Sequence, residues 1–318
     1  MLLEGRILGR VRIGLVGIGK IARDQHVPVL EASSDFELVA TASRHNYVDG
    51  VANFRDVREM LAGVALDAVA VCTPPQHHFE AASASLEAGK HVLLEKPPSR
   101  TLAEFECLAA LAAQKKLTLF QSWHSRFAPA VALAAETLRG RNISSAAIVW
   151  KEDVRRWHPG QTWIWKAGGF GIFDPGINAL SILTRLLPDE IFVDDARLSV
   201  PSNCQAPIAA DLALRSASGI AVTAAFDFRQ TGDQTWDIRF TTDRGEVLLS
   251  EGGSRLFVDG REVKHSNAPH AHAEYAPLYD HFATLIRSGR SDADARPFKL
   301  VADAFLIGER IAVEEFHE

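Results

Sequence analysis

The segment from His91 to Pro98 reads HVLLEKPP and places one lysine, Lys96, just after a short apolar run. A neutral lysine amine accepts a proton, and open α/β sheets bind their ligands at the carboxyl ends of the strands. Lys96 is therefore the first candidate for a general base. The alternative is a surface lysine paired with Glu95, because lysines are usually exposed.

A second set of polar residues lies in Asp174-Pro175-Gly176-Ile177-Asn178. If a helix starts here, Asp174 and Asn178 are four positions apart, share one face and can both reach a bound pair of hydroxyl groups. The alternative is that Asp174 is only the N-cap of a helix whose first residue is Pro175.

The elements that must position these side chains differ between the two parts of the chain. Through the first ~125 residues, short apolar strands alternate with helices, which predicts stacked βαβ units and a parallel sheet. Thr101 and Glu104 form a capping-box signature before one of these helices. The expected strands are Arg12 to Val16, Glu37 to Ala42, Ala68 to Cys72, His91 to Leu94 and Leu117 to Gln121, with helices over Phe79 to Ala88 and Leu102 to Ala113.

After about Phe127 the strands alternate in polarity, which is typical of an antiparallel sheet. The fold class is therefore α/β: an N-terminal doubly wound Rossmann domain (residues 1–125) and a C-terminal α+β domain (residues 126–318) with a large, mainly antiparallel open sheet. Two helices should close the chain, and the last could pack back on the first domain. The expected strands are Ile143 to Val154, Ile208 to Arg215, Ile220 to Phe228, Trp236 to Thr242 and Glu246 to Leu249, and the helices are Tyr275 to Arg287 and Leu300 to Glu315.

The first strand leads into a dinucleotide-binding turn. In VRIGLVGIGKIA, Gly17 allows the turn, Gly19 lets the backbone approach a pyrophosphate, and the small Ala22 lets the following helix pack on the strand. Such a GxGxxA string is weak evidence alone, but here it follows a predicted strand and precedes a helix.

The end of the second strand indicates the cofactor. NAD enzymes usually place Asp or Glu there, whereas this chain reads Val39-Ala40-Thr41-Ala42-Ser43-Arg44. Ser43 can hydrogen-bond a 2′-phosphate, and Arg44 can pair with it or stack on adenine. We therefore expect NADP as cofactor, with NAD also accepted. The alternative is that Arg44 is a solvated loop residue.

Composition excludes several classes of protein. The 318 residues are 47% hydrophobic and carry 34 Lys+Arg against 40 Asp+Glu, a formal charge of -6 without a basic run. We therefore expect no nucleic-acid partner. Cys72, Cys107 and Cys204 lack metal-ligand spacing, so neither a metal site nor a disulfide framework is expected, and a reducing cytoplasm fits. No apolar stretch reaches the length of a membrane span, and the first residues do not resemble a secretory leader.

The glycine turn, Cys72-Thr73-Pro74-Pro75 and Glu95-Lys96-Pro97, followed by an antiparallel-sheet domain, resemble the Gfo/Idh/MocA oxidoreductases along nearly their whole length. The stretch from Trp150 to Asn178, with GKIARDQH (residues 19–26) and PSNCQ (201–205), is similar to the aldose 1-dehydrogenases of that family that act on L-arabinose and D-galactose. The resemblance implies a nicotinamide cofactor, a pyranose at the domain cleft, oxidation at C1 to a lactone, and a homo-oligomer, a dimer, through the C-terminal sheet. The cofactor-binding positions expected are Gly17, Ile18, Gly19, Lys20, Ile21, Ser43, Arg44, Cys72, Thr73, Pro74, His77, Glu95 and Lys96.

The resemblance also suggests roles for the sugar-side residues. Many family members have a histidine where this chain has Asn178, so here Lys96 should be the base, Asp174 its catalytic helper or a hydroxyl acceptor, and Asn178 an orienting donor. Glu152 and Asp153 point to opposite faces of a strand, and by resemblance Glu152 is the one at the sugar. Its alternative is a solvent-facing acid.

Four tryptophans add flat apolar surfaces that suit the C–H face of a pyranose, and we select Trp157 and Trp236 from Trp157, Trp163, Trp165 and Trp236 as sugar contacts. Core or interface packing is the alternative. His124, just after the fifth strand, is a candidate for a hydrogen bond to the sugar or to the nicotinamide side, with a structural histidine as its alternative.

Substrate choice follows from hydroxyl geometry. L-Arabinopyranose presents the hydroxyl arrangement of D-galactopyranose without the exocyclic hydroxymethyl group, so one polar site should accept both. D-Glucose, epimeric at C4, should react less well because it leaves a buried polar partner unpaired. Two further functions stay open: another oxidation of this family, on a cyclitol or a dihydrodiol, and a non-catalytic NADP-binding sensor.

Overall fold

The computed structural model describes residues 9–187, 189–264 and 272–317, and the chain forms two compact units. The first unit comprises Met1–Trp123 and His270–Ala295, and the second comprises His124–Pro269 and Arg296–Glu318. The leader-free N-terminus expected from residues 1–6 lies outside the described residues. Within the described residues, no helix is both long and apolar enough to cross a membrane.

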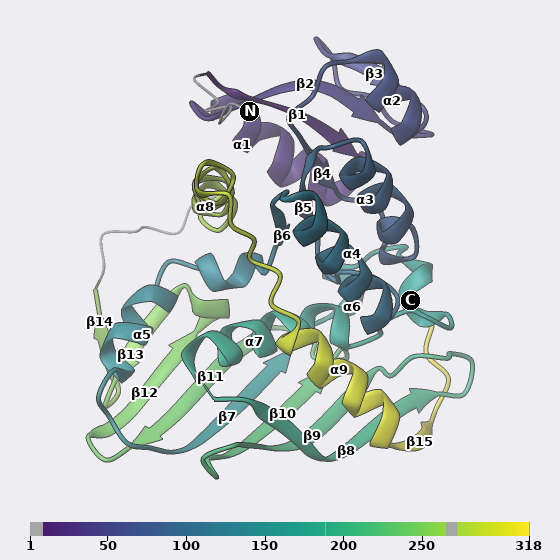
Figure 1. The fold of residues 1–318 in the computed structure, drawn as a ribbon. Coiled ribbons are helices and arrows are strands. Elements are labelled where there is room, and N and C mark those ends of the chain that lie inside the picture. Colours follow the sequence, from purple (N-terminus) through teal and green to yellow (C-terminus); the bar gives the residue numbers. More distant parts are fainter. Residues whose placement is uncertain (1–8, 188, 265–271, 318) are drawn as a thin grey trace. The chain divides into compact units, whose positions relative to one another are not determined.

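The first unit contains a six-stranded parallel sheet in the order β3-β2-β1-β4-β5-β6 (Figure 1). This is the doubly wound order with a switch point between β1 and β4, where such sheets bind dinucleotides. The parallel sheet expected from the sequence is confirmed. The strands are β1 (Val11–Val16), β2 (Phe36–Ala42), β3 (Ala52–Phe54), β4 (Ala68–Val71), β5 (His91–Leu94) and β6 (Leu119–Gln121).

Local sequence sets the helix boundaries of the first unit. The Thr101 side chain accepts from the Glu104 amide at 3.2 Å and begins α4, as the capping box predicts. Asp56 caps α2 in the same way. The helical segments are η1 (Ala22–His26), α1 (Val27–Ala32), α2 (Val57–Gly63), η2 (Pro75–His77), α3 (His78–Glu87) and α4 (Leu102–Lys115).

One more helix, α8 (Tyr275–Ser288), belongs to the first unit although it comes late in the chain. Its Phe282 stacks on Phe36 of β2, with ring centroids 5.6 Å apart, and Tyr279 meets the same ring edge-on at 5.4 Å. A single boundary after residue 125 therefore does not describe the division into units. Helix α8 belongs to the first unit, and the last helix of the chain belongs to the second.

The second unit contains a nine-stranded sheet in the order β14-β13-β12-β11-β7-β10-β9-β8-β15. Pairing is antiparallel except between β7 and β10 and between β8 and β15, so the expected mainly antiparallel sheet is confirmed. The strands are β7 (Ile143–Lys151), β8 (Ile191–Pro201), β9 (Ala209–Ser216), β10 (Ala221–Asp227), β11 (Thr235–Thr242), β12 (Gly245–Ser250), β13 (Arg255–Val258), β14 (Arg261–Val263) and β15 (Glu309–Val313).

Helices contact one face of this sheet. Phe173 of α7 packs on Phe226 of β10, with ring centroids 6.0 Å apart, while Thr223, an odd number of positions away, points to the other face and is exposed. The helical segments of this unit are η3 (His124–Phe127), α5 (Val131–Leu138), α6 (Val154–Trp157), η4 (Thr162–Trp165), α7 (Phe173–Leu186), η5 (Glu251–Gly253) and α9 (Arg296–Ile307).

The last predicted helix is wrong in its second half. Helix α9 ends at Ile307, and after Gly308 the chain forms strand β15, which pairs with β8. A Cβ on Gly308 would lie 2.4 Å from the Ala304 carbonyl oxygen, so this tight exit from the helix needs glycine. The β-branched Ile311 and Val313 then favour a strand.

Candidate active site

The glycine turn has the geometry that a dinucleotide requires. Gly17 has a φ of +90°, and a Cβ there would lie 2.7 Å from the Thr73 backbone nitrogen, so no other residue fits. Gly19, in contrast, has nothing within 4 Å of its Cβ direction. The Asn46 side chain donates to the Ile18 carbonyl at 2.8 Å and holds the turn. The backbone at Gly19 is therefore open to close approach by a phosphate.

The next two predicted cofactor residues, Lys20 and Ile21, precede η1 and are exposed. Lys20 forms an exposed ion pair with Asp24, one turn further along. At the end of β2, Ser43 is half-buried and Arg44 is exposed. The exposure of Arg44 fits both a contact with a 2′-phosphate and a solvated loop residue, so its role in cofactor binding stays a prediction.

The carboxyl end of β4 carries the segment Cys72-Thr73-Pro74. Thr73 adjoins Gly17, and its Oγ1 is buried without a hydrogen-bond partner among the described residues. A buried hydroxyl of this kind suits a polar group of a bound cofactor. His77 and Pro74 are exposed beside it. These features fit a dinucleotide along the β1–β4 edge.

Two buried side chains beside this segment have shifted pKa values. Burial, and secondarily the negative charge of Glu95, raises the pKa of the Cys72 thiol well above its ordinary value. Burial lowers the pKa of His78, whose ring nitrogens lie 2.5 Å from the Thr73 carbonyl oxygen and 3.2 Å from that of Pro98. His78 thereby ties the Thr73 turn to the turn after Lys96, a role that the sequence did not reveal.

Lys96 follows β5 and is half-buried, and its peptide bond to Pro97 is cis. Glu95 is 3% exposed, and its Oε2 accepts from the Lys96 backbone amide at 2.8 Å. The Glu95 carboxylate therefore lies in the interior. The role of Lys96 stays a prediction, with a surface lysine paired with Glu95 as its alternative.

In the second unit, a histidine lies between two buried carboxylates. His158 Nε2 is 3.2 Å from Glu152 Oε1, and His158 Nδ1 is 3.4 Å from Asp174 Oδ2. Both acids are 4% exposed, whereas the His158 side chain is 13% exposed. Buried acids with directed polar partners are typical of functional sites. Glu152, His158 and Asp174 are called the acid–histidine cluster below.

The structure also decides between the two interpretations of Asp174. Helix α7 begins at Phe173 with Ile172 as its N-cap, so Asp174 is the second helical residue and does not cap the helix. Helix-like hydrogen bonding begins before Phe173 and includes Asp174, because the Asp174 amide donates to the Gly171 carbonyl at 3.0 Å. Asn178, half-buried and one turn later, is on the same face of α7.

Of the neighbouring acids, Glu152 belongs to the cluster and Asp153 does not. Asp153 caps α6 by accepting from the Arg155 amide at 3.0 Å. Trp236 donates its indole N–H to Glu152 Oε2 at 2.8 Å. The two acids therefore have different hydrogen-bond partners.

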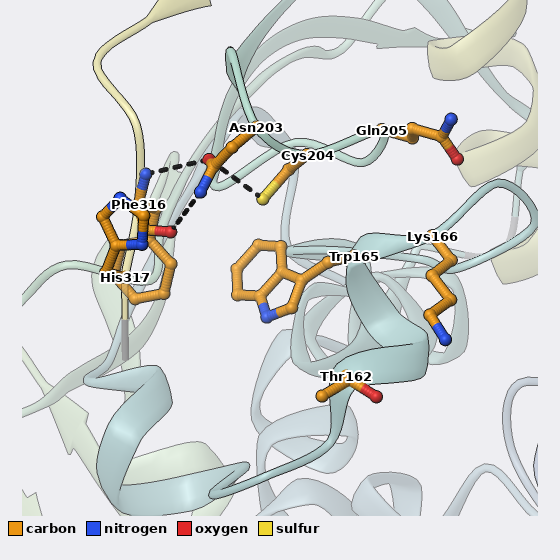
Figure 2. Close-up of a pocket in the computed structure, with 8 residues that line it drawn as sticks. All are labelled: Thr162, Trp165, Lys166, Asn203, Cys204, Gln205, Phe316 and His317. Atoms are coloured by element: carbon orange, nitrogen blue, oxygen red, sulfur yellow. Dashed lines mark hydrogen bonds between the residues drawn. The ribbon is translucent and has the colours of Figure 1, made fainter.

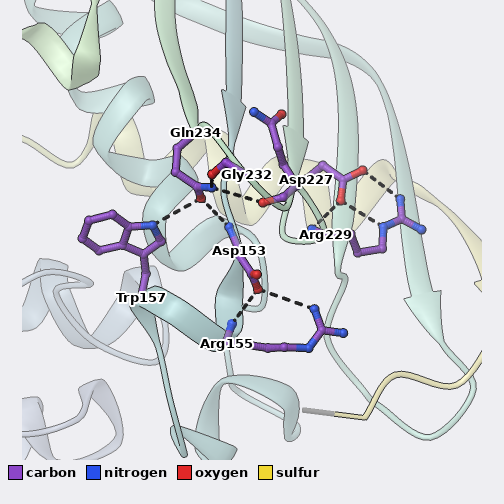
Figure 3. Close-up of polar contacts among 8 residues, drawn as sticks. Asp153, Arg155, Trp157, Asp227, Arg229, Gly232 and Gln234 are labelled. Atoms are coloured by element: carbon purple, nitrogen blue, oxygen red, sulfur yellow. Dashed lines mark hydrogen bonds and ion pairs between the residues drawn. The ribbon is translucent and has the colours of Figure 1, made fainter.

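The two selected tryptophans lie together, as the sequence alone could not show. Trp157 and Trp236 meet edge to face with centroids 5.2 Å apart, and Trp157 is 39% exposed. Gln234 holds Trp157 of this pair, because its Oε1 accepts from Trp157 Nε1 at 3.2 Å and from the Asp153 amide at 2.5 Å (Figure 3). The exposed Trp157 face therefore borders the acid–histidine cluster through Trp236.

His124 Nδ1 lies 3.3 Å from Ser125 Oγ. His158 is the site residue that sequence reasoning missed. The sequence did contain a signal for His158: it lies between Trp157 and Pro159-Gly160, shortly after the two acidic residues that end a strand. Its partners, however, are six and sixteen positions away and meet it only in the fold.

A separate cavity of about 600 Å³ opens elsewhere in the second unit and contains none of the predicted site residues (Figure 2). Asn203 holds the backbone of Phe316 there through hydrogen bonds of 2.8 and 3.0 Å. Its lining residues are Thr162, Trp165, Lys166, Asn203, Cys204, Gln205, Phe316 and His317. Among the described residues, no group of three His, Cys, Asp or Glu side chains is placed to hold a metal ion.

The strand order, the glycine turn and the open Gly19 backbone define a dinucleotide-binding Rossmann protein with a second, sheet-based unit. Residues 11–122 match the model of the Gfo/Idh/MocA oxidoreductase family with an NAD-binding Rossmann fold. A galactose 1-dehydrogenase of Pseudomonas fluorescens is 46% identical over 309 residues, covering 97% of this chain and 99% of that protein. The chain belongs to this oxidoreductase family.

Two further similarities differ in extent. The crystal structure of a D-galactose-1-dehydrogenase from Rhizobium etli matches with a TM-score of 0.92 and 50% identity, over 98% of this chain and 99% of that chain. A D-glucoside 3-dehydrogenase of Escherichia coli is 32% identical over 126 residues, which is 37% of this chain and 36% of that protein. The galactose enzymes thus match both units, whereas the second similarity covers only part of the chain.

Proposed function

We propose that this protein is an NAD(P)-dependent aldose 1-dehydrogenase that oxidises D-galactose and L-arabinose at C1 to the corresponding lactones. The observation that carries the proposal is the acid–histidine cluster beside the Trp157–Trp236 pair, which joins buried hydroxyl acceptors to an apolar face as a pyranose requires. Near-full-length similarity to galactose 1-dehydrogenases supports the same substrate class.

The chemistry divides between protein and cofactor. When bound, the oxidised nicotinamide accepts the hydride from C1. The Lys96 amine accepts the proton of the anomeric hydroxyl, so that the C1–O bond becomes the lactone carbonyl and Lys96 ends as an ammonium. Asp174 and Glu152 accept hydrogen bonds from ring hydroxyls, and His158 between them holds both carboxylates in place.

The remaining residues orient the sugar. Asn178, one turn after Asp174, supplies an amide donor to the same part of the ring, and an amide cannot exchange a proton as a histidine would. Trp157 presents an exposed ring to the C–H face, with Trp236 behind it. His124 remains a candidate for a hydrogen bond to the sugar or to the nicotinamide side.

Cofactor choice is proposed to favour NADP, with NAD accepted. The support is the exposed Arg44 and the half-buried Ser43 at the end of β2, where no acid follows the strand. A guanidinium there pairs well with a 2′-phosphate, and an unphosphorylated ribose loses only that contact.

We also propose a homodimer through the outer face of the nine-stranded sheet. Ala147, Thr223 and Ala213 form a row across β7, β10 and β9 on the face opposite Phe226. These small side chains make a flat surface that a second sheet can approach closely.

The test is a cofactor-reduction assay by absorbance of the reduced nicotinamide, with D-galactose, L-arabinose, D-glucose and myo-inositol, each with NADP and NAD. We expect activity with the first two sugars and a clearly lower kcat/KM with glucose, because a C4 epimer leaves a buried acceptor unpaired. Equal efficiency with glucose would reject the pocket assignment, and inositol alone as substrate would favour a cyclitol dehydrogenase. No signal with any of them would favour a non-catalytic sensor.

A further inference from the structure

A buried hydrogen-bonded cluster in the first unit surrounds Glu95 and is not used by the proposed chemistry. It consists of Glu95, His26, Tyr275 and Tyr279 and is called the Glu95 cluster below. Glu95 Oε1 accepts from the Tyr275 hydroxyl at 2.9 Å and lies 3.1 Å from His26 Nε2. His26 Nδ1 lies 2.7 Å from the Tyr279 hydroxyl. All four residues are at most 3% exposed.

The protonation states make this a chain of donors directed at Glu95. Burial, and secondarily the charge of Glu95, raises the pKa of Tyr275 well above its ordinary value, so its hydroxyl keeps its proton. Burial likewise raises the pKa of Tyr279. Because a carboxylate oxygen only accepts, His26 Nε2 is a donor to Glu95, while His26 Nδ1 faces the Tyr279 hydroxyl.

The second carboxylate oxygen of Glu95 connects the cluster to Lys96, the candidate base. Glu95 Oε2 accepts from the backbone amide of Lys96 at 2.8 Å. The carboxylate therefore connects three segments: the end of β5, η1 just after the glycine turn, and the first turn of α8. The two tyrosines are one helical turn apart on α8, so both face the same cluster.

A buried carboxylate is costly unless several donors satisfy it, and an apolar side chain of similar size would often serve stability as well. Here the Tyr275 hydroxyl, the His26 ring and the Lys96 amide all bond to the Glu95 carboxylate, next to the Lys96 side chain. A rigid support of this kind is what a proton-accepting amine needs, because small displacements of a catalytic group are expensive in rate.

We propose that Glu95 is a positioning residue that fixes the backbone at Lys96, and that Tyr275, with His26 and Tyr279 behind it, fixes Glu95. The assignment rests on the proposed function, in which Lys96 is the base. It adds residues of α8 and η1 to the determinants of the reaction rate, although their side chains bind to Glu95 and not to the sugar.

The test is a double-mutant cycle of Tyr275→Phe and Lys96→Ala, with kcat and both KM values measured for D-galactose and NADP. Tyr275→Phe removes one hydroxyl and keeps the ring packing. We expect kcat to fall about tenfold with KM values within about twofold, since the lost contact acts through the base. In the Lys96→Ala background the same substitution should change kcat less than about twofold.

Controls separate positioning from general destabilisation. Ser85→Ala removes a buried hydroxyl that donates to the Ala81 carbonyl at 2.7 Å in α3, away from Glu95, and should leave kcat unchanged. NADP dissociation constants from tryptophan fluorescence and thermal unfolding midpoints are measured for every variant. For Tyr275→Phe, we expect the dissociation constant to stay within about twofold.

The outcomes are distinct. If the parent protein does not reduce NADP with D-galactose, the proposed function fails, and if Lys96→Ala leaves kcat unchanged, the role of Lys96 as the base fails. If Lys96→Ala lowers kcat strongly but Tyr275→Phe has no effect, or the same effect in both backgrounds, only the positioning role is overturned. Should Tyr275→Phe not fold, Tyr279→Phe, one hydrogen bond further from Glu95, replaces it: a smaller fall in kcat that disappears in the Lys96→Ala background supports the role, and a fall that persists there rejects it.

Discussion

Substitution of Glu152 by glutamine is the sharpest test of the sugar site. Glu152 is 4% exposed and bonds to Trp236 and His158 at 2.8 and 3.2 Å. Glutamine keeps the shape and one carbonyl acceptor for the indole N–H. It removes the negative charge and places an amide where a carboxylate oxygen met the histidine ring.

The expected magnitude follows from those contacts. A hydrogen bond to a charged group contributes about 1.5–3 kcal/mol and one between neutral groups about 0.5–1.5 kcal/mol, so each contact weakens by roughly 1–1.5 kcal/mol. One weakened bond to a sugar hydroxyl lowers kcat/KM about tenfold, and disturbance of His158 can add up to another tenfold. We therefore predict a 10- to 100-fold fall, as an order of magnitude.

The assay is steady-state NADP reduction with D-galactose, with Asp153→Asn as the matched control. Asn is as good an N-cap as Asp, so the control keeps the cap of α6 and should retain kcat/KM within about twofold. If Glu152→Gln also stays within twofold, or if both variants lose activity equally, the assignment of Glu152 to the sugar is refuted.

Three further predictions concern the cofactor, the oligomer and the pH dependence of stability. Arg44→Glu should raise the KM for NADP about 10- to 100-fold and change that for NAD little, and an unchanged NADP value would remove Arg44 from the phosphate site. Thr223→Arg should convert a dimer to a monomer by light scattering, whereas a monomeric parent protein would end the dimer proposal. Burial lowers the pKa of His91 from its ordinary value of 6.5, and its Nδ1 accepts from the Thr118 amide at 3.0 Å. As the pH falls, His91 is therefore protonated in the unfolded chain before it is protonated in the folded chain. The free energy of unfolding should fall as the pH drops below about 6.5, and in urea titrations His91→Gln should make that fall shallower.

The first unit was largely predictable from the sequence because its strands are buried on both faces and read as apolar runs. Strand β3 was missed, since its three residues lie at the sheet edge and are largely exposed. In the second unit β8 was missed although it has eleven residues, because an irregular register between Val193 and Asp195 breaks the alternation of polarity.

Site residues could be predicted together when they lie on one helix or strand, but not when they come from several elements that meet only in the folded protein. Asp174 and Asn178 share a helix, so their spacing predicted one common face. Glu152 and Asp153 are adjacent, so spacing predicted only that they point apart, and the choice of Glu152 came from the family resemblance. His158 meets its acids only after β7, α6 and α7 pack together. The contact of Tyr275 with Glu95 joins residues 180 positions apart and leaves no local pattern.

The position of oxidation is the central claim, and isotope transfer measures it directly. D-galactose carrying deuterium at C1 is oxidised with NADP, and the reduced nicotinamide and the sugar product are analysed by mass spectrometry and NMR. We predict deuterium in the nicotinamide and a lactone as first product, with no transfer from sugar labelled at C3. Deuterium transferred from C3, with C1 retaining its label, would contradict the account and indicate chemistry of the kind named for the D-glucoside 3-dehydrogenase relative.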